Sequence, residues 1–201
     1  MKLALNLSYK GERTYLHGSD FFNLLEKKAS EVTKLDDAYV KQLSFHKVAN
    51  NACELHDVQP ENQSTVSGKI SFGSPSNPDI PEMWIVETDK PVENRYEYDE
   101  PFIEGKVVFD QEQKTTSLTG GAGYSAIEEI IVLTKALNYH LSPDVAGKWL
   151  FGRIDLNEQL AKKYEHVTLK MKRMFPNRFS ISEIIADDKH IGDIQFIVGK
   201  P

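Results

Sequence analysis

The stretch LTGGAGYSAIE (residues 118–128) resembles the stretch LHGSDFFNLLE (residues 16–26), and this pair determines the fold that we expect. The two stretches lie 102 residues apart in a chain of 201 residues. Self-similarity at a fixed spacing indicates a fold made of repeated units. We therefore expect a first repeat over residues 1–92, a linker over residues 93–102 and a second repeat over residues 103–201. The alternative is a fortuitous likeness within an ordinary α+β domain.

Each stretch opens a predicted helix. In the first repeat, Ser19 or Asp20 can cap a helix that runs to about Lys34. Its apolar residues form one stripe, so one side of this helix should face water. The helix of the second repeat, from about residue 123 to about residue 141, is apolar around most of its circumference. We expect it to be covered on more than one side, either by an additional subunit in a homodimer or by the other repeat of the same chain.

Strand-like sequence follows each helix and indicates an antiparallel sheet. Turn residues at Pro176-Asn177 and at positions 187–190 predict that the last three strands are consecutive hairpins. The predicted strands cover residues 39–48, 65–72 and 83–87 in the first half, and residues 148–156, 167–174, 178–185 and 191–198 in the second.

Composition narrows the classes of protein that fit. The net charge is −6, and the excess acid lies in residues 1–102, so sequence-independent binding of nucleic acid is not expected. A single cysteine, Cys53, allows no intrachain disulfide and no cysteine-based zinc site, which favours a cytoplasmic setting. The N-terminus lacks the apolar stretch of a signal peptide, and no apolar stretch predicts a membrane span.

The segment from Gly123 to Glu128 resembles the start of the central helix in dehydratases of the hotdog superfamily. In its β-hydroxyacyl carrier-protein dehydratases a glycine opens the central helix and an acid follows five residues later, as Gly123 and Glu128 do here. With the order of elements, this resemblance implies a double hotdog, an α+β fold in which an antiparallel sheet wraps around two long helices. The chain departs from the family in two places: no histidine lies between Phe102 and Glu128, and Ala122 replaces the usual proline.

The resemblance implies action on an acyl thioester carried by coenzyme A or an acyl carrier protein, as a dehydratase or thioesterase of fatty acid or polyketide metabolism. The alternative is a non-catalytic hotdog-like module that binds a small ligand or a protein partner. Basic residues in the second half could meet coenzyme A phosphates or an acidic carrier protein, although solvated strand faces explain most of them. They are Lys162, Lys163, Lys170, Lys172, Arg173 and Arg178.

Three residues are candidates for catalysis: Glu128, His17 and Asp20. Hotdog pockets form where two units meet, so a residue of one repeat can work with a residue of the other. A histidine near neutral pKa and a partly buried carboxylate suit general base and general acid roles. The structural alternatives are a histidine bonded to backbone and an aspartate that caps a helix.

The candidates for substrate binding are backbone groups and loop side chains. Gly120, Gly121 and Gly123 precede a helix N-terminus, where free N–H groups favour a developing oxyanion; hotdog enzymes polarise the thioester carbonyl there. Small residues at a close backbone crossing are the alternative. His46 and Asn50 lie at or just beyond the end of a predicted strand and could supply polar groups to a pocket, although a strand-end loop is the simpler explanation. No metal-ligand spacing and no cofactor motif is present in the sequence.

Overall fold

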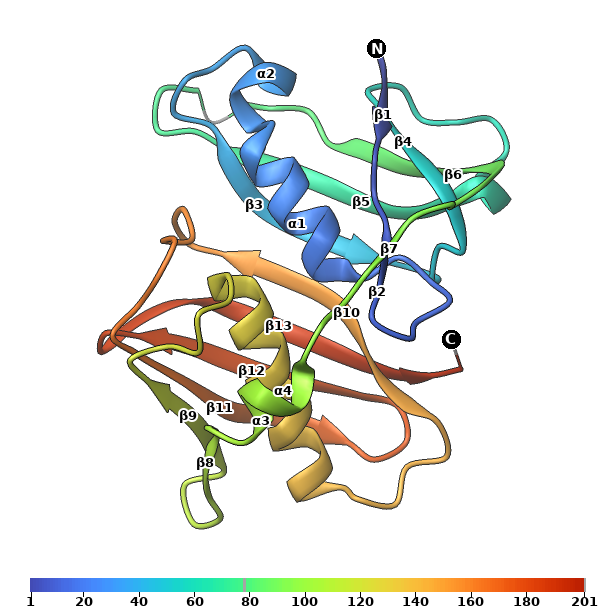
Figure 1. Cartoon of the computed structure of the whole chain (residues 1–201). Coiled ribbons are helices and arrows are strands. Elements are labelled where there is room, and N and C mark those ends of the chain that lie inside the picture. The colour runs from blue at the N-terminus through green and yellow to red at the C-terminus, as the bar shows by residue number, and fades with distance from the viewer. Residues whose placement is uncertain (78, 201) are drawn as a thin grey trace. The chain divides into compact units, whose positions relative to one another are not determined.

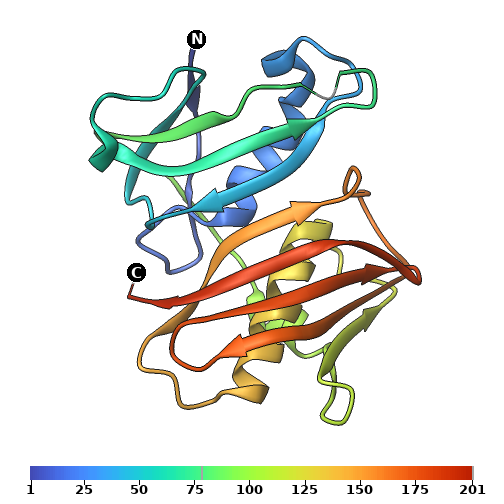
Figure 2. The same cartoon turned by 180° about the vertical axis from the view of Figure 1, so that it is seen from behind.

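The computed structural model describes residues 1–77 and 79–200, and the chain divides into two compact units, Met1–Tyr98 and Asp99–Pro201. Each unit combines antiparallel strands with a helix on one face of the sheet (Figures 1 and 2). This is the α+β class predicted from the sequence. The predicted linker, residues 93–102, contains a short strand of the first unit and the start of a helix of the second.

Alternating buried and exposed residues produce the sheet of the first unit. Its strands follow the order β1-β4-β6-β5-β3, and all neighbours are antiparallel. A separate parallel pair joins β2 to β7. The sequence analysis missed β4. The strands are β1 Lys2–Leu5, β2 Tyr9–Lys10, β3 Tyr39–Phe45, β4 Asn51–His56, β5 Val66–Gly73, β6 Met83–Pro91 and β7 Arg95–Tyr96, with a 3-10 turn at Gln63–Thr65.

The helix of the first unit is interrupted. Helix α1 (Gly18–Lys27) ends where Lys28 leaves helical geometry (φ −99°, ψ 2°), and α2 (Ala29–Thr33) ends at Lys34 in the left-handed region (φ 64°). The prediction of one helix to about Lys34, and so of two long helices, is not confirmed. The apolar spacing continues across the break because a distortion at one residue hardly shifts the period.

The second unit contains the long helix. Helix α4 (Ala126–Leu141) packs on strands in the order β10-β13-β12-β11-β9-β8, and ten of its residues are buried, as the breadth of its apolar face predicts. The last three strands are consecutive antiparallel hairpins, which confirms the prediction. The elements are α3 Glu100–Glu104, β8 Val108–Asp110, β9 Thr115–Thr119, β10 Lys148–Leu156, β11 His166–Phe175, β12 Phe179–Ala186 and β13 Lys189–Gly199.

The two units differ in strand order. In the first unit the first strand after the helix, β3, pairs with the third, β5. In the second unit the corresponding strand, β10, pairs with the fourth, β13. The local pattern of helix and strands is therefore similar in the two halves, but the structure does not confirm a strict repeat.

Candidate functional site

Helix α1 begins at Gly18, and His17 holds the N-cap position with extended dihedrals (φ −86°, ψ 140°). The expectation that Ser19 or Asp20 caps the helix is wrong, because both lie inside the first turn. The Nδ1 atom of His17 is 2.7 Å from Ser19 Oγ and 3.4 Å from Ser19 N. Ser19 is fully buried and His17 is half-buried, so the histidine ring is held along its Nδ1 edge.

A fully buried lysine lies against this turn. Lys10 of β2 is 0% exposed; its Nζ donates to Ser19 Oγ at 2.9 Å and lies 3.4 Å from Asp20 Oδ1. A buried charge is costly unless it is paired and hydrogen-bonded, and Asp20 supplies the opposite charge. The Oδ2 atom of Asp20 is buried and has no hydrogen-bond partner within the described part of the chain. Asp20, predicted as catalytic, is thus half of a buried ion pair.

Two tyrosines complete the environment of this pair. Tyr96 donates its hydroxyl to Asp20 Oδ1 at 2.8 Å, and the Tyr98 ring centre lies 3.9 Å from Lys10 Nζ, a cation–π geometry. Parallel pairing of β2 with β7 places Lys10 opposite Tyr96. We call the following set the lysine cluster: Lys10, His17, Ser19, Asp20, Tyr96 and Tyr98.

Four members of the lysine cluster were not identified as site residues from the sequence. Lys10 resembles any charged residue of a strand next to a turn, and Ser19 resembles a helix cap. Tyr96 and Tyr98 lie in the acidic segment interpreted as a linker. The aromatic residues Tyr96, Tyr98 and Phe102 in this mainly polar segment were a local signal that the segment packs against other residues.

Glu128 lies in the first turn of α4, next to the N-cap residue Ser125. Its Oε2 atom accepts hydrogen bonds from Ser125 N at 3.0 Å and from Ser125 Oγ at 2.6 Å. This exchange is the carboxylate half of a capping box, which stabilises the start of the helix. The half-buried Glu128 therefore has a structural role in addition to the catalytic role predicted for it.

The neighbouring Glu129 is the more deeply buried carboxylate, with 6% of its surface exposed. It turns back onto the glycine loop, residues 120–123, where its Oε1 accepts a hydrogen bond from Ala122 N at 2.6 Å. A second N–H of the loop, that of Gly120, donates to Glu165 O at 2.8 Å. A carboxylate at this position repels an oxyanion, so it weakens the case for carbonyl polarisation by this loop.

The glycines of the loop have backbone conformations that side chains disfavour. Gly120, Gly121 and Gly123 have φ values of +72°, +66° and +88°. At Gly121 an added Cβ would lie 3.4 Å from Glu129 Oε1, whereas at Gly120 and Gly123 it would meet nothing within 4 Å. Left-handed backbone, rather than a close crossing, therefore explains Gly120 and Gly123.

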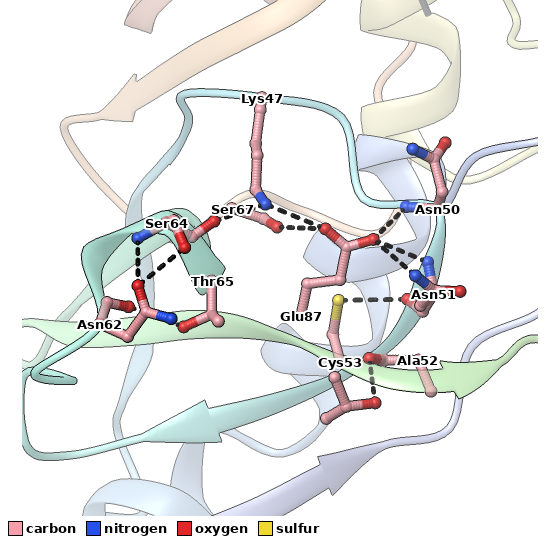
Figure 3. Close-up of polar contacts among 11 residues, drawn as sticks. Lys47, Asn50, Asn51, Ala52, Cys53, Asn62, Ser64, Thr65, Ser67 and Glu87 are labelled. Atoms are coloured by element: carbon pink, nitrogen blue, oxygen red, sulfur yellow. Dashed lines mark hydrogen bonds and ion pairs between the residues drawn. The ribbon is translucent and has the colours of Figure 1, made fainter.

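A second polar cluster surrounds Glu87 of β6 (Figure 3). Its Oε1 accepts from Asn50 N at 2.8 Å and Asn51 N at 2.9 Å, and its Oε2 lies 3.2 Å from Lys47 Nζ. Burial acts to raise the pKa of Glu87, but the two backbone N–H groups and the Lys47 ammonium outweigh it and lower the pKa. Glu87 thus fixes the loop that connects β3 to β4.

The structure places the remaining predicted residues, His46 and Asn50, in this same loop with both exposed. Asn50 forms its hydrogen bonds here through its backbone: its N–H donates to Glu87, and its carbonyl accepts from Tyr9 Oη at 2.6 Å. Burial, and then the Glu87 charge, raises the pKa of the nearby Cys53 thiol to about 12. A turn explains His46 and Asn50 without a ligand, and their role in substrate binding stays a prediction.

Two kinds of feature are absent from residues 1–77 and 79–200. No group of three or more His, Cys, Asp or Glu side chains in this range could hold a metal ion. No helix formed by these residues has the length and apolar character needed to span a membrane.

Comparisons with known proteins give structural neighbours only. No protein-family model matches the chain, and no curated protein matches it by sequence. A thioesterase II from Thermobifida fusca is 12% identical, covers 99% of this chain and 92% of its own, and has a TM-score of 0.45. The dehydratase domain of PpsC from Mycobacterium tuberculosis, in complex with C12:1-CoA, is 7% identical over 92% of this chain and 85% of its own (TM-score 0.47).

A third neighbour, the dehydratase domain of MlnD from Bacillus amyloliquefaciens, is 12% identical, covers 99% of this chain and 92% of its own, and has a TM-score of 0.43. These neighbours are hotdog-fold proteins. At TM-scores below 0.5 the likeness assigns no activity to this chain, so its function must be argued from its own residues.

Proposed function

We propose that the chain binds an acyl thioester of coenzyme A or of an acyl carrier protein and acts on it as a dehydratase or thioesterase. The observation that carries the proposal is the arrangement at the start of α1, where Ser19 holds the Nδ1 edge of His17 at 2.7 Å. A histidine oriented through one ring nitrogen is suited to accept a proton at the other. The fully buried Lys10 pairs with Asp20 in the same turn.

His17 is the general base of the proposed reaction. In dehydration its Nε2 takes the proton from the carbon next to the thioester carbonyl, and the β-hydroxyl leaves as water with a proton from an acid. In thioester hydrolysis His17 takes a proton from the attacking water instead. We assign the acid role to Glu128, whose Oε2 is held by Ser125. The acid role of Glu128 stays a prediction.

The acyl carrier is proposed from charge. Lys170 and Arg173 of β11 are exposed and could contact phosphates of coenzyme A or an acidic carrier protein. Lys172 of the same strand is less available, because its Nζ is 2.9 Å from Asp193 Oδ2.

A second candidate function is a non-catalytic module that binds a small ligand or protein partner. The observation that favours it is the carboxylate of Glu129, which accepts from Ala122 N in the loop expected to polarise a carbonyl. If this donor stays occupied, the loop cannot stabilise an oxyanion through it.

The test is turnover of a panel of acyl thioesters by the full chain. Dehydration of 3-hydroxyacyl thioesters is followed by enoyl absorbance, and hydrolysis by release of free thiol. We expect His17→Gln and Glu128→Gln each to reduce turnover by about 10²-fold or more. The glutamine at position 128 keeps an oxygen that can accept from Ser125 N, so the helix start is preserved.

Matched controls are exposed residues of the same type, His190→Gln and Glu112→Gln, which should leave turnover unchanged. Binding of acyl-coenzyme A without turnover would support the binding module instead. A folded chain that neither binds nor turns over any acyl thioester would refute the proposed function.

A further inference from the structure

The lysine cluster contains more polar groups than the proposed reaction uses, and Ser19 lies at its centre. The Oγ atom of Ser19 is 2.9 Å from Lys10 Nζ, 2.7 Å from His17 Nδ1 and 3.2 Å from Asp20 Oδ1. A serine hydroxyl has one hydrogen to donate and two lone pairs that accept. The lysine ammonium can only donate, so one lone pair of Ser19 is committed to it.

The single hydroxyl hydrogen of Ser19 has two possible acceptors, and the choice fixes the tautomer of His17. If Ser19 donates to His17 Nδ1, neutral His17 carries its proton on Nε2. If His17 carries its proton on Nδ1, it donates to the second lone pair of Ser19, and the hydroxyl turns to Asp20. Only in the second arrangement does Nε2 have the lone pair that a base requires.

The geometry favours the second arrangement. All three contacts of Ser19 Oγ are then hydrogen bonds, and the one to Asp20 has a carboxylate acceptor, which makes it stronger than a neutral bond. In the first arrangement the oxygens of Ser19 and Asp20 face each other at 3.2 Å with no hydrogen between them. The contact from Ser19 N to His17 Nδ1 needs a lone pair on Nδ1 and so favours the first arrangement, but at 3.4 Å it is long, and the bond from Ser19 Oγ to the Asp20 carboxylate outweighs it.

We propose that Asp20, through the hydroxyl of Ser19, selects the Nδ1–H tautomer of His17 and so leaves Nε2 as the base. Asp20 and Ser19 are then positioning residues, and no proton moves between them during the reaction. When Nε2 takes the proton of the substrate, His17 becomes an imidazolium that still donates to Ser19. This inference rests on the proposed function, in which His17 is the base.

The charged groups around the cluster act on His17 in opposite directions. Lys10 of β2 and the N-terminus of α1 disfavour the imidazolium, whereas Asp20 of α1 favours it. Tyr96 of β7 donates a hydrogen bond to Asp20, and the ring of Tyr98 lies against the ammonium of Lys10. Arg13, whose guanidinium lies 5.7 Å from the Tyr98 ring centre, adds a second positive charge.

The experiment is ¹⁵N NMR of the full chain labelled at histidine, because ring nitrogen shifts distinguish the two neutral tautomers without substrate. His17 is assigned by comparison with His17→Gln and recorded above its pKa. We expect Nδ1–H in the wild-type chain and a shift toward Nε2–H in Ser19→Ala. Asp20→Asn should shift the tautomer in the same direction. Asp89→Asn, an exposed residue of the first unit, is the matched control and should leave the tautomer unchanged.

The outcomes separate this inference from the proposed function. An Nε2–H tautomer in the wild-type chain, or an unchanged tautomer in Ser19→Ala and Asp20→Asn, would overturn the inference even if turnover depends on His17. Nδ1–H lost in both variants would support it even if no thioester is turned over. Where turnover is present, kcat of Ser19→Ala should fall at least about 10-fold with little change in KM.

Discussion

Replacing Lys10 with methionine should destabilise the first unit by about 3 kcal/mol. The substitution keeps the apolar stem and removes an ammonium that is 0% exposed, with Ser19 Oγ at 2.9 Å and Asp20 Oδ1 at 3.4 Å. Removal of one member of a buried ion pair costs about 3–5 kcal/mol, because the other charge stays buried. The 3.4 Å separation, and the hydrogen bond from Tyr96 that Asp20 keeps, place the expected loss at the lower end.

A double-mutant cycle tests whether the loss comes from the pair. Lys10→Met and Asp20→Asn should each destabilise the unit, and the double variant should be more stable than the sum predicts by at least about 1 kcal/mol. The assay is urea unfolding followed by fluorescence in a Trp149→Phe background, where Trp84 of β6 reports on the first unit. Lys41→Met, an exposed control, should change stability by less than about 0.5 kcal/mol. Additive effects, or a loss below that of the control, would refute the buried pair.

The other predictions concern one side chain each. Native Cys53 should resist alkylation at pH 8 and react fully in urea. Its pKa in the folded chain is raised to about 12, so the stability that the protonated thiol contributes should be lost as the pH rises above 9. Comparing the pH dependence of unfolding with that of Cys53→Ala isolates this contribution. The pKa of Glu87 is lowered in the folded chain. In urea titrations, the stability difference between wild type and Glu87→Gln should therefore be constant above about pH 5 and shrink as the pH falls below 4.5. A difference that is unchanged at pH 3 would contradict the lowered pKa. Gly123→Ala should lower the free energy of unfolding by about 1–2 kcal/mol through backbone strain alone, since φ is +88° and an added Cβ meets nothing within 4 Å. The control Gly105→Ala, at φ −64°, should change it very little. Thermal unfolding of both variants measures the difference.

Local pattern predicted the second unit better than the first. Strands β10 to β13 lie within two residues of the predicted ranges, and helix α4 begins three residues after its predicted start. Local pattern predicts such elements because alternation and helical spacing are properties of neighbouring residues. Strand β4 was missed because its sequence, Asn51–His56, begins with residues typical of turns. The break at Lys28 was missed because it leaves the apolar spacing of the helix intact.

The candidate site was predicted in part. Glu128 was selected from the glycine-to-acid spacing that it shares with the dehydratases, and His17 and Asp20 because a residue of one repeat could work with one of the other. The structure gives each of them hydrogen-bond partners, and their catalytic roles stay predictions. Their partners Lys10 and Tyr96 were not selected, because neither has a chemical signature in its own stretch of sequence. The pair Glu128 and Glu129 shows the same limit: residue type did not reveal that Glu129 is the one that turns inward.

The sequence by itself determined the α+β class, the position of α4 and the hairpins that end the chain. These follow from interactions over a few residues, which the order of amino acids records directly. Tertiary structure decided the strand order of each unit and the burial of Lys10 beside Asp20. Both depend on contacts between residues that are distant in the sequence, such as the pairing of Lys10 with Tyr96. The stability of such contacts depends on how deeply the residues are buried, which cannot be predicted from their neighbours in the sequence.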